Sequence, residues 1–378
     1  MLRPRRDHYK WLFLVLTLCV LLSGSIAPLA EGISSPTIVA APWPAADQMF
    51  RKDHRWLGGD GGSSIDLGDG RVLWLFGDSF IAAGDRHLRS ESVLVRNSIA
   101  IQSGYDPLSA TIRFHWRVKN NIPQSFFPEE GTTWFWPGQG VVTNGFLLIF
   151  LLEILPSDND LGFEFSGWKA LRVSNFEDEP SEWNMCWSET PRNPYPIITG
   201  SGSVLLADGY LYAFSSDESK THDVYLARWP IKEVAGGDLK NPQWWAGHPG
   251  GWCEQGKLQD KPTTIFTKGQ AEFTVHYEPR LGGFVQIQTT GFGSADIAFR
   301  TAKHLVGPWS SLERLYRPKE YGVKDILLYA GKAHPEQSGS DMIITYVVSH
   351  LDFHRILNDR NIYYPRFLKC KIIPNIVE

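Results

Sequence analysis

Two aspartates in the segment WLGGDGGSSIDLGDGRVLWLFGDSF are placed symmetrically about a glycine-rich turn. Asp60 and Asp78 each lie nine residues from Asp69, the middle residue of the turn at residues 68–70. If the segment folds as a symmetric hairpin, the two Cβ atoms face each other at about 4.5–5.5 Å on one side of the sheet. The spacing therefore predicts a close pair of carboxyl groups.

Such a pair suits cleavage of a glycosidic bond. Burial among Trp56, Trp74 and Phe76 is expected to raise the pKa of one carboxyl, so that one acid and one carboxylate coexist at neutral pH. We expect Asp60 to protonate the leaving oxygen and Asp78 to attack the anomeric carbon or activate water, with the reverse assignment open. The structural alternative places Asp60 in a turn and Asp78 at a strand end, and a one-residue register shift separates the two.

A third acidic candidate is Glu272 in the segment QAEFTVHYEP. Period-2 alternation puts Glu272, Thr274 and His276 on one strand face. Glu272 could serve as an acid or as an acceptor for sugar hydroxyls, and His276 as a donor to the substrate. A satisfied structural pair between neighbouring sheets is the alternative.

Further candidates for substrate binding lie in separate segments. Asn97 begins a strand in RNSIAIQ beside Arg96, His334 lies in AGKAHPE, and Arg366 lies in YYPRF. An arginine of this kind also commonly braces neighbouring sheets through an ion pair. Trp136, which precedes a Pro-Gly turn in TTWFWPGQG, offers an apolar platform on which a sugar ring stacks.

A repeat organises the chain around these residues. Each repeat has a short turn that feeds an alternating apolar strand, and the turns are marked by Gly70, Gly145, Gly209, Gly283 and Ser340, spaced 57 to 75 residues apart. Each interval is long enough for a four-stranded unit. Five such units with little helical periodicity predict an all-β, five-bladed β-propeller. The alternative is two consecutive β-sandwiches, but no low-complexity linker divides residues 50–378.

The N-terminus predicts export. A cationic start, MLRPRRDHYK, precedes the apolar run WLFLVLTLCVLL and the small-residue stretch SGSIAPLA. We expect a signal peptide at 1–30, with an uncleaved anchor as the alternative, then a linker at 31–49 and one propeller domain at 50–378. The expected location is secreted or periplasmic, with no membrane contact beyond that anchor. The remaining Cys186, Cys253 and Cys370 can form at most one disulfide.

Composition and motifs exclude several functions. The formal net charge is -4, and residues 1–30 hold four of the cations, so no basic surface for nucleic acid is expected. The sequence lacks GxxxxGK[ST], HExxH, GxSxG and CxxC, which leaves nucleotide, zinc-protease and serine-hydrolase functions without support. No cofactor or catalytic metal is expected, although a structural Ca²⁺ in the central channel is open.

Several of these segments together resemble a known family. WLGGDGGSSIDLGDGRVLWLFGDSF, RNSIAI, WFWPGQG, AEFTVHYEP, RTAKHLVGPWS and YYPRF are similar to a propeller family, first catalogued as a domain of unknown function, that includes bacterial endo-D-arabinofuranases. The resemblance spans about residues 56–367 and implies that Asp60 and Asp78 are the catalytic carboxylates. Five-bladed furanosidases and fructosidases use three acidic residues, and Glu272 is the third by that likeness. Gln139 departs from the pattern, which has an acidic residue there.

These observations predict a glycoside hydrolase that cleaves a furanoside-containing, arabinan-like glycan with a pair of aspartates. The alternative of a different class is a noncatalytic glycan-binding propeller of the cell envelope, and a third is a propeller that serves only as a scaffold. The partner in the first two cases is a polysaccharide or other glycan.

Overall fold

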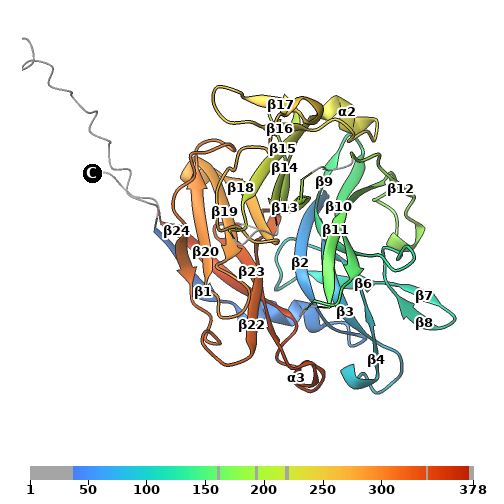
Figure 1. The fold of residues 1–378 in the computed structure, drawn as a ribbon. Coiled ribbons are helices and arrows are strands. Elements are labelled where there is room, and N and C mark those ends of the chain that lie inside the picture. Colours follow the sequence, from blue (N-terminus) through green and yellow to red (C-terminus); the bar gives the residue numbers. More distant parts are fainter. Residues whose placement is uncertain (1–36, 160–161, 192–194, 218–220, 338, 374–378) are drawn as a thin grey trace, which may run out of the picture.

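The computed structural model describes residues 37–159, 162–191, 195–217, 221–337 and 339–373. Five antiparallel sheets surround a central axis (Figure 1). The innermost strand of each sheet contacts the innermost strands of its two neighbours, so these strands form a closed ring. The prediction of a five-bladed β-propeller is confirmed, and the alternative of two β-sandwiches is wrong.

The blades follow one another along the chain. Named from the inside outward, blade 1 contains β2 (Trp56–Gly68), β3 (Arg71–Ala82), β5 (Ser98–Ser103) and β6 (Thr111–His115), with β4 (Ser92–Val95) paired to β3, and blade 2 contains β9 (Trp134–Thr143), β10 (Phe146–Pro156), β11 (Phe163–Val173) and β12 (Met185–Trp187). Blade 3 contains β13 (Ile197–Ala207), β14 (Tyr210–Asp217), β15 (Val224–Pro230), β16 (Gln243–Trp245) and β17 (Trp252–Glu254), and blade 4 contains β18 (Phe273–Glu278), β19 (Gly283–Thr289), β20 (Ile297–Ala302) and β21 (Glu313–Tyr316). Blade 5 contains β22 (Ile326–Ala333), β23 (Met342–His350), β24 (Pro365–Ile373) and β1 (Thr37–Pro42).

Other elements are short. They are the hairpin β7 (Arg117–Lys119) and β8 (Ile122–Gln124), the helices α1 (Pro44–Asp47), α2 (Ile231–Ala235) and α3 (Phe353–Asn358), and the 3₁₀ helices Gln48–Arg51, Arg89–Glu91, Pro180–Glu182, Gln255–Lys257, Pro279–Leu281 and Pro335–Gln337. None of the helices in the described part of the chain is long and apolar enough to cross a membrane. The predicted signal peptide lies outside the described residues.

The five turns identified in the sequence join the first and second strand of each blade. Asp69-Gly70, Asn144-Gly145 and Asp208-Gly209 each have φ between 48° and 78° at both positions. Two consecutive positive φ values define the type I′ turn, whose twist matches that of the flanking strands and which favours Asn or Asp followed by Gly. The hairpin repeat is therefore a direct consequence of local turn chemistry.

The propeller begins before residue 50. Residues 37–42, within the segment expected to be a linker, form β1 and pair with β24 from Thr37↔Ile373 to Pro42↔Leu368. The N-terminal strand is thus the outermost strand of the last blade and closes the ring (Figure 1). The peptide N–H of Trp43 donates to the Phe367 carbonyl at 2.9 Å, and the Phe367 N–H donates to Asp47 Oδ1 at 2.7 Å. The linker assignment fails because this strand has no turn mark of its own and pairs with a distant part of the chain.

The core consists of apolar clusters between blades. Its largest fully buried side chains include Trp56, Trp74, Trp229 and Trp244, so much of the tryptophan content serves packing. Cys186, Cys253 and Cys370 are free thiols, of which Cys370 is buried.

Candidate active site

A cavity of about 890 Å³ lies at one end of the ring of inner strands. Its wall includes Asp60, Asp78, Glu272 and Trp136, four of the residues that the sequence singled out. They come from three different blades, since β2 and β3 carry the aspartates, β9 carries Trp136, and Glu272 directly precedes β18. The fold therefore brings the predicted acidic residues together.

The two aspartates lie on neighbouring strands, as the hairpin predicts. Gly59 pairs with Ser79, the register that the symmetric turn requires, but the ladder is irregular on both sides of that pair, and Gly61 pairs with Phe76. A Cβ atom at Gly77 would lie 2.5 Å from Asp60 Oδ1. A glycine at this position lets the Asp60 carboxyl fold back against the β3 backbone.

Asp60 occupies a site that favours its protonated form. Burial is the largest cause, followed by the charges of Asp78 and Glu272, and together they raise its pKa to about 8. The phenol of Tyr329 donates to Asp60 Oδ2 at 2.9 Å and that of Tyr363 at 3.3 Å, which partly opposes the rise. Asp60 is consequently a carboxylic acid at neutral pH.

Asp78 has donors suited to its ionised form. The indole N–H of Trp136 donates to Asp78 Oδ1 at 2.9 Å, and Arg96 Nη1 donates to Oδ2 at 3.2 Å. Burial raises the pKa of Asp78 above its ordinary value, and the Arg96 charge and these hydrogen bonds offset only part of that rise. Arg96 is held in turn over the ring of Trp134, at 4.3 Å from its centroid. The neighbouring carboxyls thus have different environments, as an acid and a base require.

Glu272 is tied to a buried lysine. Lys332 Nζ donates to Glu272 Oε1 at 2.7 Å and to Ser63 Oγ at 2.9 Å. The Lys332 side chain is 4% exposed, whereas that of Glu272 is 34% exposed and reaches the cavity. Lys332 therefore fixes Glu272 while leaving part of its carboxylate open to a ligand.

Aromatic rings form the wall beside Asp78. Trp136 is partly exposed, and its ring meets Phe163 edge-on at 4.7 Å and Phe165 at 6.2 Å between centroids. Trp134, by contrast, is buried. Trp136 therefore occupies the place expected for a sugar-stacking platform, with an additional role in orienting Asp78.

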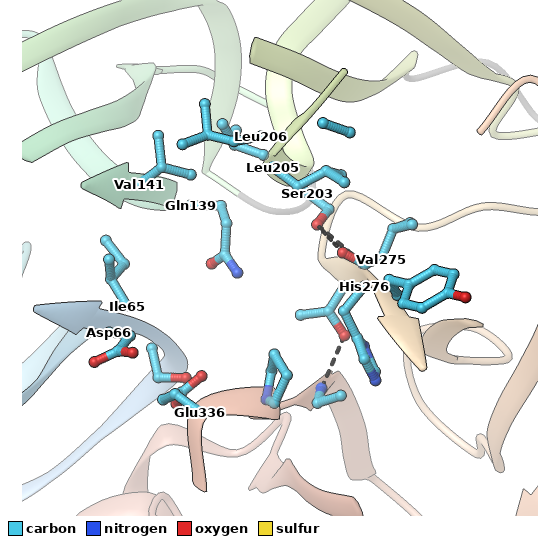
Figure 2. Close-up of a pocket in the computed structure, with 18 of the residues that line it drawn as sticks. Ile65, Asp66, Gln139, Val141, Ser203, Leu205, Leu206, Val275, His276 and Glu336 are labelled. Carbon is cyan, nitrogen blue, oxygen red and sulfur yellow. Dashed lines mark hydrogen bonds between the residues drawn. The ribbon is translucent and has the colours of Figure 1, made fainter. Parts of the chain in front are cut away.

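His276 lies away from this cavity. His276 lies within β18, whereas Glu272 precedes that strand, and four residues of an extended chain span about 13 Å. His276 lines a second pocket of about 560 Å³ at the other end of the inner strands, together with Gln139 and Glu336 (Figure 2). Burial lowers the pKa of His276 to about 4. His276 therefore does not lie beside Glu272, and its binding of substrate stays a prediction.

The remaining sequence candidates have structural contacts. The fully buried Asn97 donates to the carbonyls of Phe127 and Phe135 and accepts from the Phe127 N–H. His334 is also fully buried, and its ring nitrogens lie 2.6 Å from Ser64 Oγ and 2.8 Å from Thr345 Oγ1.

Arg366 braces the fifth blade. Its Nη1 donates to Glu320 Oε1 at 2.5 Å, in the connection between β21 and β22. Neither Asn97, His334 nor Arg366 lines the cavity that holds the aspartates. Their polar groups are engaged by other parts of the fold, and their assignment to substrate binding stays a prediction.

The sequence analysis missed Tyr329, Tyr363 and Lys332. Each contacts an acidic residue from a blade distant in sequence, so no local spacing marks it. The alternating strand ILLYAGKA carries the one available signal, since it places a lysine among small and apolar residues. A lysine there needs a buried anionic partner.

Within the described residues, no group of three or more His, Cys, Asp or Glu side chains could hold a metal ion. The geometry provides instead a protonated carboxyl, a second carboxyl with two donors, a lysine-bound glutamate and an aromatic wall in one open cavity. This set can transfer a proton to a leaving oxygen and supply a nucleophile or base.

Comparison with known proteins agrees with this fold. A protein from Bacteroides ovatus ATCC 8483, provisionally named a hydrolase, is similar with a TM-score of 0.69 at 17% identity, over 88% of this chain and 90% of that chain. The α-L-arabinofuranosidase PaAbf62A from Podospora anserina is similar with a TM-score of 0.46 at 10% identity, over 85% and 92% of the two chains. The first of these two similarities, with a TM-score of 0.69, indicates a shared fold.

At the level of sequence, no curated protein matches. A family model described as a domain of unknown function, DUF5005, matches residues 45–372. Membership of a family that includes endo-D-arabinofuranases stays a prediction. The residues matched by the DUF5005 model cover nearly the whole propeller. The chain therefore belongs to the DUF5005 family.

Proposed function

We propose that this protein is a glycoside hydrolase in which Asp60 and Asp78 are the catalytic pair. The observation that carries the proposal is the contrast between the two neighbouring carboxyls in one open cavity. Asp60 has its pKa raised to about 8, whereas Asp78 receives hydrogen bonds from Arg96 and Trp136. Environments that separate two carboxyls in this way are typical of an acid and its partner base or nucleophile.

In the proposed reaction, Asp60 donates its proton to the glycosidic oxygen as the bond to the anomeric carbon breaks. Asp78 either attacks that carbon directly or removes a proton from the attacking water. Arg96 and Trp136 keep the Asp78 carboxylate oriented. Glu272, fixed by Lys332, accepts hydrogen bonds from sugar hydroxyls and maintains the raised pKa of Asp60 through its negative charge.

The substrate that we propose is a furanoside-containing, arabinan-like glycan. The aromatic wall of Trp136, Phe163 and Phe165 supports a sugar ring as ligand, because such rings present apolar faces that stack on aromatic side chains. The resemblance of the GGD and LFGDS segments to endo-D-arabinofuranases supports the furanoside. We propose a secreted or periplasmic location, in keeping with a polymeric substrate and the N-terminal sequence.

The test is an Asp78→Asn variant assayed for release of sugar from arabinan and from a panel of other furanans and pyranans. We expect release by the wild type, loss of at least about 10³-fold in the variant, and retained binding of the polysaccharide. Asp208→Asn is the matched control, because Asp208 lies in an exposed type I′ turn that accepts asparagine equally well.

The outcome also separates hydrolysis from simple binding. A wild-type protein that binds one of these polysaccharides but releases nothing from any of them would be a noncatalytic glycan-binding propeller. Equal activity of Asp78→Asn and the wild type would remove Asp78 from the mechanism.

A further inference from the structure

The wall of the cavity formed by blades 3 and 4 differs in charge from the wall that holds the aspartates. Lys268 and His222 line this side, on two segments joined by backbone hydrogen bonds. The Lys268 N–H donates to the Thr221 carbonyl at 2.8 Å, and the Gly269 N–H donates to the His222 carbonyl at 2.8 Å. The two side chains therefore belong to one local unit.

Both residues have an unfavourable backbone conformation. His222 has φ of 43° and Lys268 has φ of 58°, in the left-handed region that side chains other than those of Gly, Asn and Asp seldom adopt. Such conformations are energetically unfavourable and concentrate at functional sites. Glycine or asparagine would relieve this strain, yet the chain holds a cationic and an imidazole side chain here.

Polar groups without partners are present on the two segments that carry Lys268 and His222. His222 Nδ1 is buried and has no hydrogen-bond partner, and the exposed ammonium of Lys268 forms no ion pair with any residue in the described ranges. As the Nδ1–H tautomer, His222 is a donor into the same space. The two groups suit a ligand that accepts hydrogen bonds and carries negative charge.

A buried cation lies directly behind this unit. Arg300 on β20 is 4% exposed, and its guanidinium donates to the Thr267 carbonyl at 3.2 Å and to the Lys268 carbonyl at 3.4 Å. Its Nε has no partner, and no carboxylate in the described part of the chain pairs with it. Arg300 also lies over the Phe266 ring, 4.3 Å from its centroid, and does not line the cavity itself. Its charge therefore adds to that of Lys268 from behind the segment that carries Lys268.

The acidic side chains of the cavity are protonated or paired with cations. Asp60 is protonated at neutral pH, Asp78 is paired with Arg96, and Glu272 is paired with Lys332. Among these lining residues Lys268 has no carboxylate partner in the described part of the chain, so the corner that it forms carries positive charge although three acidic residues line the same cavity.

We propose that the corner formed by Lys268 and His222 binds an anionic group of the glycan, such as a uronate carboxylate, a phosphate or a sulfate on a sugar next to the one that is cleaved. The inference rests on the proposed glycosidase function for the identity of the polymer. It specifies that a substrate with a negatively charged substituent is preferred over the neutral polymer. The binding of the anion itself does not depend on catalysis.

The first experiment measures binding of small anions by isothermal titration calorimetry. The probes are glucuronate, inorganic phosphate and sulfate, with methyl glucoside as the neutral control. We expect one of the anions to bind and the neutral sugar not to bind, and the anion that binds identifies the type of substituent. Binding of none of the three anions, or equal binding of methyl glucoside, overturns the proposal.

Variants then locate the site. Lys268→Asn removes the charge and suits a left-handed backbone, and we expect the affinity for the anion to fall at least about tenfold. Lys268→Arg should restore most of the affinity. The exposed Lys371 on β24 provides the control, and Lys371→Asn should bind as the wild type does. Equal affinities of Lys268→Asn and Lys371→Asn overturn the proposal.

The Asp78→Asn variant distinguishes this inference from the proposed function. It should bind the anion at least as tightly as the wild type does, because it loses a negative charge from the same cavity, while failing to release sugar. If no polysaccharide is cleaved but anion binding still requires Lys268, the glycosidase proposal fails and the anion site stands. If a polysaccharide is cleaved without any preference for an anionic substituent, the glycosidase proposal stands and the anion site fails.

Discussion

Removal of the Tyr329 hydroxyl should move the pKa of Asp60 upward. Its hydrogen bond to Asp60 Oδ2 is 2.9 Å long and favours the ionised carboxylate. A hydrogen bond to a charged group contributes about 1.5–3 kcal/mol, and one pKa unit corresponds to about 1.4 kcal/mol. Because the neutral acid keeps part of this bond, we expect Tyr329→Phe to raise the pKa from about 8 to about 9.

The sign of the effect on activity follows from the role of Asp60. A general acid must be protonated, so activity falls as pH rises through its pKa. The alkaline limb of kcat/KM should therefore lie about one unit higher in Tyr329→Phe than in the wild type, with the acidic limb little changed. Release of sugar from arabinan over roughly pH 4 to 10 measures both limbs. Carbon-13 NMR of the labelled Asp60 carboxyl gives the same pKa without a substrate.

Two matched variants control this experiment. Tyr363→Phe removes the longer hydrogen bond of 3.3 Å to the same oxygen, and it should shift the limb in the same direction by a smaller amount. Tyr277→Phe, at an exposed residue of the second pocket, should shift nothing. An alkaline limb that stays in place or moves to lower pH in Tyr329→Phe would refute the assignment of Asp60 as the acid.

Two further predictions concern stability. The folded-state pKa of Asp60 lies above its unfolded value, so the stability that its protonated carboxyl contributes is lost as pH rises toward 8. Asp60→Asn should therefore stabilise the protein at pH 8 by roughly 1–3 kcal/mol while abolishing activity. Urea unfolding at pH 5 and pH 8 checks this, and a smaller gain at pH 8 than at pH 5 contradicts it. Arg366→Gln should lower the free energy of unfolding by about 1–3 kcal/mol, because it leaves the largely buried Glu320 carboxylate unpaired, with kcat/KM unchanged. The exposed Arg86–Glu91 pair is the control, since Arg86→Gln should lower the free energy of unfolding by less than about 1 kcal/mol. A loss of glycan binding in Arg366→Gln at unchanged stability would instead identify Arg366 as a substrate ligand.

The blade architecture could be predicted because its signals are local. Each Asp-Gly or Asn-Gly turn needs two residues with positive φ, and each inner hairpin shows its alternation within about twenty residues. The same local geometry placed Asp60 and Asp78 on neighbouring strands despite the irregular ladder between them. Prediction failed for the position of His276, because alternation gives the face of a strand and not the end of the channel at which a side chain emerges.

The all-β class, the number of blades and the pairing of two aspartates near an aromatic platform could all be derived from the sequence alone. These properties depend on residues that are close in the chain and on short-range turn and strand geometry. The folded structure was needed to show that β1 closes the fifth blade, that Tyr329, Tyr363 and Lys332 surround the acidic residues, and that Arg300 lies behind Lys268. These contacts join residues that are distant in the chain, and their energies come from burial and charge pairing that exist only once the ring of inner strands has closed.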